Sequence, residues 1–221
     1  MAVIYLHGFG SGPKSTKAAF FQRRLQQIGI PLLVPDLNQG QFSQLTLTRQ
    51  IQQVSQQLAE YAHPPVTLIG SSLGGLVAAW VAEQQACVQR LVLLAPAFGF
   101  LSHWLPRLGA EAVEAWQRTG SLSVFHYGEG RPLPLEYQFV TDAQGYPDGA
   151  LQRPIPTLIL HGIRDETIPI QASRNYVAHR PWAQLMPLES DHALTDVLEP
   201  IWQASSRFCG WIDAPRETGQ N

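Results

Sequence analysis

One serine of this sequence stands in a pattern that is typical of nucleophilic catalysis. Ser72 lies at the centre of Gly70-x-Ser72-x-Gly74, between an apolar run at 66–69 and a predicted helix over 73–86. Such glycines let a strand and a helix pass closely, so the serine would occupy a sharp turn that presents its hydroxyl group. The helix N-terminus behind it would favour developing negative charge. So short a pattern can arise by chance, and its interpretation depends on finding a base, an acid and oxyanion donors.

The candidate base is His192, which follows the last predicted strand, 183–188, and precedes the last predicted helix, 195–211. In a parallel sheet, the loop after this strand returns to the sheet edge that carries Ser72. A histidine in this loop can therefore reach the serine hydroxyl. Because the chain contains seven histidines, an ordinary surface histidine is the alternative interpretation.

The candidate acid is Asp165, which comes just past the penultimate predicted strand in the segment His-Gly-Ile-Arg-Asp-Glu-Thr-Ile-Pro. An acid at this point could orient the base, but it could also be a turn residue or a helix N-terminal acid. Glu166 is an adjacent competitor. Asp191 is a poorer candidate for the acid, because it directly precedes His192 and the side chains of consecutive residues usually diverge. Asp36, at another strand end, is an outside alternative and more simply a turn residue.

The candidate oxyanion donors are two backbone N–H groups. Leu73 directly follows the nucleophile, and Phe9 lies in the glycine-rich loop His7-Gly8-Phe9-Gly10 after the first predicted strand. Donors from these two places are what an acyl-transfer serine on such a turn requires. Phe9 could equally be a wall of the substrate pocket, and His7 is expected to brace the loop by hydrogen bonds.

The remaining elements predict an α/β fold. Short apolar runs with no polar face are typical of strands that are buried on both sides, and they alternate with segments of helical periodicity. The predicted strands are 2–6, 31–35, 66–69, 90–96, 156–161 and 183–188, and the predicted helices are 14–28, 43–61, 73–86, 170–179 and 195–211. This alternation indicates one domain, 1–221, with a parallel sheet covered by helices on both faces.

An insertion at about 97–152 interrupts this rhythm. It is rich in aromatic residues, which are Phe98, Phe100, Trp104, Trp116, Phe125, Tyr127, Tyr137, Phe139 and Tyr146. We expect a helix at 111–119 and a hairpin of strands 121–127 and 135–140, joined through 128–132. We interpret the insertion as a cap over the site, because it is too short for an independent core. The alternative is an extra packing layer that never touches substrate.

Composition narrows the class of protein. The chain has 221 residues, of which 45% are hydrophobic and 14% charged, and its formal net charge is −2. These values indicate a globular chain and give no electrostatic reason to expect nucleic acid or an anionic membrane as partner. The two cysteines, Cys87 and Cys209, suggest neither a disulfide framework nor a zinc site. With no apolar run long enough for a membrane span and no leader-like N-terminus, we expect a cytoplasmic enzyme.

With these motifs taken together, the chain resembles an α/β-hydrolase. The order Ser72, Asp165, His192 matches the order of nucleophile, acid and base in that fold. More narrowly, it resembles the small bacterial esterases of the YqiA type, in a loop His-Gly-Phe-x-Ser-x-Pro-x-Ser-x-Lys at 7–17 and in Gly-Ser-Ser-Leu-Gly-Gly at 70–75. The aromatic insertion departs from that pattern. The first strands usual in the fold are missing, so we expect a reduced, mostly parallel sheet of about six or seven strands.

The resemblance implies a serine hydrolase that cleaves a carboxylic ester of a small or medium apolar substrate through an acyl-enzyme intermediate. No metal or organic cofactor is expected. A thioesterase and a hydrolase of carbon–carbon bonds are alternatives on the same triad, and a catalytically silent ligand-binding protein is a third. No basic cluster accompanies the site, although Arg107, Arg131 or Arg164 could supply one polar anchor for the substrate.

Overall fold

The computed structural model describes residues 2–60 and 65–211. It contains a sheet of six strands in the order β2-β1-β3-β4-β7-β8, and every neighbouring pair is parallel. The strands are β1 (Ala2–Leu6), β2 (Leu32–Leu33), β3 (Val66–Ser71), β4 (Val88–Leu94), β7 (Thr157–Gly162) and β8 (Ala183–Leu188). The predicted α/β class and the reduced parallel sheet are therefore confirmed.

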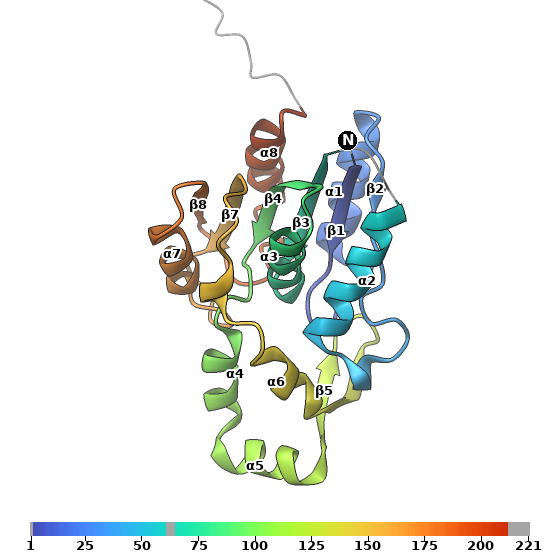
Figure 1. Cartoon of the computed structure of the whole chain (residues 1–221), viewed down its shortest axis with the longest axis vertical. Coiled ribbons are helices and arrows are strands. Elements are labelled where there is room, and N and C mark those ends of the chain that lie inside the picture. Colours follow the sequence, from blue (N-terminus) through green and yellow to red (C-terminus); the bar gives the residue numbers. More distant parts are fainter. Residues whose placement is uncertain (1, 61–64, 212–221) are drawn as a thin grey trace, which may run out of the picture.

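Both faces of the sheet are covered. In β1, Val3 and Tyr5 join one hydrophobic cluster while Ile4 and Leu6 join the other, as expected for a strand buried on both sides. One face is covered by α1 (Thr16–Gln27) and α8 (Leu198–Cys209), and the other by α2 (Leu47–Glu60), α3 (Leu73–Gln84) and α7 (Ile170–Ala178). Figure 1 shows this arrangement.

One helix begins later than its sequence pattern predicts. We expected a helix from Ser43, but a single 3-10 turn, Phe42–Gln44, comes first and α2 begins at Leu47. The α2 N-terminus is capped by a residue from another element, because Asp142 Oδ2 accepts a hydrogen bond from the Thr48 N–H at 3.0 Å. Such a contact satisfies an end group that the helix cannot satisfy itself. The predicted end at Tyr61 lies outside the described residues.

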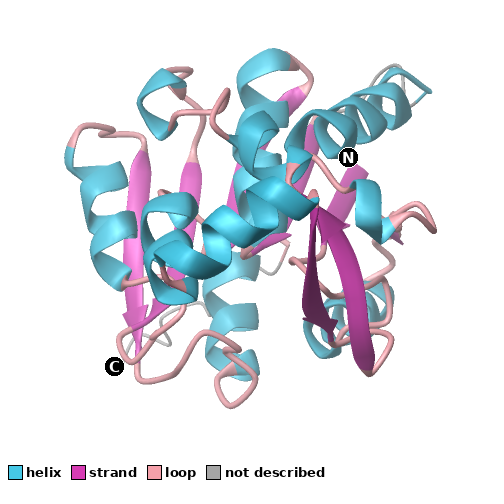
Figure 2. Cartoon of the chain, turned by 90° about the horizontal axis from the view of Figure 1, so that it is seen from below, coloured by secondary structure: helices cyan, strands magenta, loops and turns pink. Residues whose placement is uncertain are grey.

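The insertion between β4 and β7 lies beyond one end of the sheet (Figures 1 and 2). It comprises α4 (Phe100–Leu108), α5 (Ala110–Thr119), β5 (Ser121–His126), β6 (Arg131–Glu136), α6 (Gln138–Ala143) and a 3-10 turn, Asp148–Ala150. We refer to residues 97–152 as the cap. Buried cap residues, such as Trp116 and Phe139, belong to the same hydrophobic cluster as Leu6 and Leu68 of the sheet. This shared core favours the predicted single domain.

The predicted second strand of the cap hairpin was wrong. We placed it at 135–140 because the Gly- and Pro-rich segment before it reads as a turn. Instead β6 spans Arg131–Glu136, and α6 occupies the following residues. Pro132 and Pro134 pair with Phe125 and Ser123 of β5. Because the two prolines are two residues apart, their N–H positions lie on the same edge of β6, the one that faces away from β5, so no hydrogen bond of the hairpin is lost. Helix α4 was not predicted either, since Pro106 lies within it.

Close contact between α3 and the sheet leads to a stability prediction. A Cβ at Gly74 would overlap the carbonyl oxygens of Leu6 and His7. We expect Gly74→Ala to lower the free energy of unfolding by about 2 kcal/mol or more, because backbone must move to relieve the overlap. Urea denaturation followed by circular dichroism measures this change.

The matched control for that experiment is Gly149→Ala, since an added Cβ at Gly149 meets nothing within 4 Å. It should change the free energy of unfolding by less than about 0.5 kcal/mol. Equal effects of the two substitutions would contradict the packing argument.

Candidate functional site

Ser72 occupies the turn between β3 and α3 in a strained backbone conformation. Its φ of 53° and ψ of −118° lie where residues with a side chain are rarely found. The turn is held by hydrogen bonds from the Ser72 N–H to Leu94 O at 2.9 Å and from the Ala97 N–H to Ser72 O at 3.1 Å. Gly70 leaves no room for a Cβ against the backbone of α3. This is the sharp strand-to-helix turn that the sequence predicts.

His192 lies within hydrogen-bond distance of the nucleophile. Its Nε2 is 3.0 Å from Ser72 Oγ, and its Nδ1 is 2.7 Å from Asp165 Oδ2. With the carboxylate accepting from Nδ1–H, the imidazole presents Nε2 as an acceptor to the serine hydroxyl. Three residues that are distant in sequence therefore form one continuous hydrogen-bonded chain.

The loop that carries His192 is ordered by its own backbone contacts. Asp191 Oδ1 accepts hydrogen bonds from the N–H groups of Ala193 at 2.9 Å and Leu194 at 3.3 Å. Lys17 Nζ, from the N-terminal part of α1, donates to Ala193 O at 2.5 Å. Asp191 therefore turns towards its own loop, and among the described residues Asp165 is the carboxylate within ion-pair distance of His192.

The Asp165 side chain is fully buried, and four donors surround it. Oδ1 accepts from the backbone N–H groups of Thr167 and Ile168, each at 2.8 Å, and Oδ2 accepts from His192 and from His161 at 3.0 Å. Burial alone would raise the pKa of this carboxyl. The hydrogen bonds from both histidines, the charge of His192 and the Ile168 N–H outweigh burial and hold the pKa well below its ordinary value.

His161 is a site residue to which the sequence analysis assigned no role. It lies at the end of β7 with no exposed surface, and its Nε2 approaches both Asp165 Oδ2 at 3.0 Å and Ile168 O at 2.9 Å. Since both partners accept, Nε2 carries the proton, and Nδ1 accepts from the Ser173 hydroxyl at 2.7 Å. The signal that could have revealed it is its place four residues before Asp165.

The two other acids considered at this site do not contact the base. Glu166 is exposed, and no ion pair or hydrogen bond of its side chain is found among the described residues. Asp36 lies beyond β2, where it accepts a hydrogen bond from the Asn38 N–H at 3.0 Å and approaches His7 Nε2 at 3.6 Å. Asp36 is therefore a turn residue, which is the simpler of the two interpretations given for it above.

The two predicted oxyanion donors flank Ser72. Within the described part of the chain, neither the Phe9 N–H nor the Leu73 N–H donates to a backbone or side-chain acceptor. Gly8 lets the loop approach the nucleophile, because a Cβ there would lie 3.3 Å from the Ser72 Cβ. His7 Nδ1–H donates to Gly8 O at 3.0 Å, and His7 Nε2 accepts from the Leu37 N–H at 3.0 Å. Burial lowers the pKa of His7, which favours this neutral bracing form.

A pocket of about 120 Å³ opens beside Ser72. Its walls are mainly apolar and come from the glycine-rich loop 7–10, the turn between β3 and α3, the loop after β7 and the cap. The lining residues are Phe9, Ser72, Leu73, Ala97, Phe100, Trp104, Arg107, Phe139, Thr167 and Ile168. The Phe9 ring packs against Trp104 and Phe139, with centroid distances of 5.6 and 5.5 Å. The cap therefore forms part of the pocket wall and is more than a distant packing layer.

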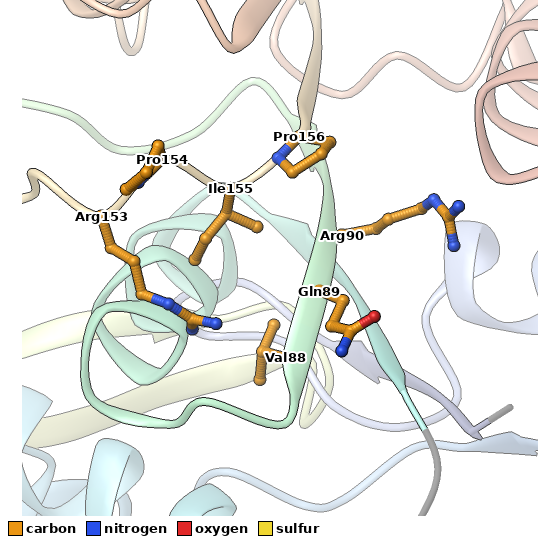
Figure 3. Close-up of a pocket in the computed structure, with 7 residues that line it drawn as sticks. All are labelled: Val88, Gln89, Arg90, Arg153, Pro154, Ile155 and Pro156. Carbon is orange, nitrogen blue, oxygen red and sulfur yellow. The ribbon is translucent and has the colours of Figure 1, made fainter.

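A larger, more open depression of about 400 Å³ lies where β4 begins and β7 is about to begin, at the opposite ends of these strands from Ser72. Figure 3 shows the guanidinium groups of Arg90 and Arg153 on opposite sides of the β4 ribbon. The Arg153 guanidinium already donates to Ala82 O, Gln85 O and Ala86 O. The residues that line this depression include no serine, cysteine or histidine and no converging charges, so the pocket beside Ser72 is the candidate site.

Residues 2–60 and 65–211 contain no group of three or more potential ligands, whether His, Cys, Asp or Glu, that could hold a metal ion. No helix in the same ranges has the length and apolarity needed to cross a membrane. Both cysteines are free thiols, Cys87 exposed and Cys209 buried.

The parallel sheet, the strained turn at Ser72 and the chain order of serine, aspartate and histidine together define a member of the α/β-hydrolase superfamily. Comparison with family models narrows this class. The model of the uncharacterised protein family UPF0227 matches residues 2–209, and the chain belongs to that family. The resemblance to an α/β-hydrolase that was drawn from the motifs is thereby confirmed.

Individual relatives are more distant. The mouse mitochondrial palmitoyl-protein thioesterase ABHD10 is 24% identical over 185 residues, which cover 77% of this chain and 61% of the relative's length. The solved structure of mouse alpha/beta hydrolase domain-containing protein 10 superimposes with a TM-score of 0.79 at 21% identity, covering 96% of this chain and 90% of that one. Est1E from Butyrivibrio proteoclasticus, bound to ferulic acid, gives 0.73 at 22%, covering 94% and 87%. These likenesses show the fold.

The hydrogen bonds of Asp165 predict a pH-dependent contribution to stability. Its folded-state pKa lies below the unfolded value of about 3.9, so the carboxylate stabilises the fold above that pH and the contribution fades as pH falls towards the folded pKa. We expect Asp165→Asn to cost about 1–3 kcal/mol at neutral pH and less in acid. Urea denaturation across this range measures it. An equal cost at both ends, or a similar pattern in the exposed neighbour Glu166→Gln, would contradict the assignment.

Proposed function

We propose that the chain is a serine hydrolase that cleaves carboxylic esters of small or medium apolar substrates through an acyl-enzyme intermediate. The observation that carries this proposal is the continuous hydrogen-bonded chain from Ser72 Oγ through His192 to Asp165, with distances of 3.0 and 2.7 Å. A serine hydroxyl is a weak nucleophile until a base within reach accepts its proton and a third group orients that base.

In the proposed reaction, Ser72 Oγ attacks the carbonyl carbon as His192 Nε2 accepts the hydroxyl proton. Asp165 keeps the imidazole in the correct tautomer and stabilises the imidazolium that forms. The imidazolium then returns the proton to the leaving oxygen or sulfur, which departs as an alcohol or thiol. Water deprotonated by His192 attacks the acyl-enzyme next, and the acid is released as Ser72 regains its proton.

The oxyanion of each tetrahedral intermediate would be received by the N–H groups of Phe9 and Leu73. Both groups are free of protein acceptors among the described residues and belong to pocket-lining residues. Each preorganised donor of this kind contributes about 2.7–4 kcal/mol to lowering the barrier. The aromatic rings around Ser72 favour an apolar acyl or alcohol group over a highly polar one.

The same triad serves closely related reactions that differ in the leaving group. One relative carries the name of a palmitoyl-protein thioesterase, which makes thioesters the first alternative substrates. Carbon–carbon bonds of dicarbonyl compounds are attacked by the same nucleophile and come next. A silent ligand-binding protein would not need the aligned hydroxyl, imidazole and carboxylate. A cytoplasmic location stays a prediction.

The central prediction concerns the nucleophile. Wild-type protein should hydrolyse para-nitrophenyl esters, with the rate passing through an optimum as the acyl chain grows to fill the pocket. Ser72→Ala should lower kcat by about 10⁶-fold, to background, because the nucleophile is lost. The exposed hairpin residue Ser123 supplies the control, and Ser123→Ala should behave as wild type. A fluorophosphonate probe should label wild type and the control but not Ser72→Ala.

The outcomes separate the candidate functions. Labelling together with ester turnover supports the esterase, and labelling without ester turnover directs the search to thioesters and dicarbonyl compounds. Absence of both would overturn the hydrolase proposal in favour of the silent binding protein.

A second prediction identifies the acid. Asp165→Asn should lower kcat for the same esters by about 10⁴-fold, because the amide favours the wrong tautomer of His192. Glu166→Gln should stay within about twofold of wild type, as an exposed side chain with no contact to the base. The ratio of the two kcat values decides between these neighbours, and a larger loss in Glu166→Gln would transfer the role to Glu166.

A further inference from the structure

Arg107 is the charged residue among the walls of the pocket beside Ser72. It lies in α4, and with Phe100 and Trp104 it follows the spacing i, i+4 and i+7, which places all three on one face of the helix. All three residues line the pocket. Phe100 is buried, Trp104 is half-buried and Arg107 is exposed. The pocket wall therefore runs from apolar near the sheet to cationic at its open end.

Within residues 2–60 and 65–211, Arg107 has no partner of its own. Among the described residues, no carboxylate lies within 4.0 Å of its guanidinium and no acceptor is hydrogen-bonded to it. A guanidinium keeps its charge at all relevant pH values and offers several donors in a planar fork that suits carboxylate or phosphate oxygens. An unpaired cation at the end of an apolar wall is thus placed to bind an anionic group on whatever fills the pocket.

The other two arginines considered as anchors are placed differently. Arg131 lies in the cap hairpin, outside the pocket, with its Nε 3.8 Å from Glu129 Oε2. Arg164 is close to the site in sequence, but its guanidinium donates to Glu189 Oε2 at 3.1 Å and to Glu189 O at 2.9 Å. Of the three, Arg107 alone is among the pocket-lining residues.

We propose that Arg107 is a specificity-determining residue that selects esters carrying a carboxylate or similar anion separated from the scissile carbonyl by an apolar segment. The step of seven positions from Phe100 to Arg107 advances roughly 10 Å along the helix axis, which sets the scale of that segment. This inference rests on the proposed function, because the carbonyl is placed at Ser72. The anion can belong to the acyl part or to the leaving alcohol, and the same cation would bind either.

The test uses pairs of substrates that differ in the charged group. On the acyl side, para-nitrophenyl hydrogen adipate and hydrogen suberate are compared with para-nitrophenyl hexanoate and octanoate. On the alcohol side, the hexanoate ester of para-hydroxybenzoate is compared with that of para-cresol. The readout is the ratio of kcat/KM for the charged ester to kcat/KM for its neutral partner. Because each pair is compared across variants, differences in intrinsic reactivity cancel.

Arg107→Met keeps the apolar stem of the side chain and removes the charge, so we expect it to lower this ratio by about tenfold for at least one pair. Arg107→Lys keeps the charge without the planar fork and should retain part of the preference. The matched control is Arg131→Met, which removes the same charge from the same cap and should leave the ratio as in wild type. The pair that responds identifies the acyl or the alcohol side.

The result separates this inference from the proposed function. Wild type that cleaves the neutral esters through Ser72, with a ratio unaffected by Arg107→Met, would overturn the role of Arg107 and leave the hydrolase standing. An equal fall of the ratio in Arg131→Met would assign the effect to the general field of the cap and overturn it also. Failure of wild type to cleave any ester, charged or neutral, would count against the hydrolase itself.

Discussion

The close passage of α3 over the ends of β1 and β3 is the constraint on which the site depends. Gly70 and Gly74 let backbone meet backbone there, and Ser72 is held at positive φ by hydrogen bonds to the strand-end loop after β4. Strain of this kind costs about 1–3 kcal/mol and persists only where the surroundings enforce it. The almost completely buried α3 provides that enforcement. As a result the Ser72 hydroxyl, the Leu73 N–H and the glycine-rich loop 7–10 are positioned by one packed unit.

The second half of the site is organised by a buried negative charge. Asp165 has no arginine or lysine within ion-pair distance among the described residues, and dipolar donors together with two imidazoles stabilise it instead. His161 fills one of these positions and anchors the carboxylate to Ser173 of α7. Gly162 lets the backbone around Ser190 approach β7, so the acid loop and the base loop share a contact. The carboxylate is therefore held in position by contacts from both loops and from β7.

Prediction from sequence succeeded where local pattern and global fold agree. The strands of the sheet are continuous apolar runs, and Ser72, Asp165 and His192 each follow a strand, so a parallel sheet brings them to one edge. The cap resisted prediction because its elements depend on tertiary contacts. β6 contains two prolines, and it can pair with β5 because both prolines have their missing N–H groups on the edge of β6 that faces away from β5. Helix α4 forms although it contains Pro106. His161 was missed since a buried polar partner carries no periodic signal of its own.

The cap is joined to the body at both of its flanks. On one side, Asp142 of α6 caps the N-terminus of α2. On the same side, the cap hairpin is hydrogen-bonded to the glycine-rich loop 7–10, where the Gly128 N–H donates to Gly10 O at 3.2 Å. On the other side, the buried Arg180 donates to Asp148 O and Leu151 O at 2.9 Å, and its guanidinium carbon lies 4.1 Å from the centroid of the Tyr176 ring.

These attachments connect the cap side of the pocket wall to the glycine-rich loop 7–10. Since the hairpin is bonded to the loop that carries Phe9, a movement of the hairpin would also disturb the position of the Phe9 N–H. The aromatic wall and the Phe9 N–H are therefore coupled by backbone contacts as well as by ring packing. Helix α4 carries Phe100, Trp104 and Arg107 of the pocket wall, so variation there can alter the shape and charge of the pocket while Ser72, His192 and Asp165 keep their geometry.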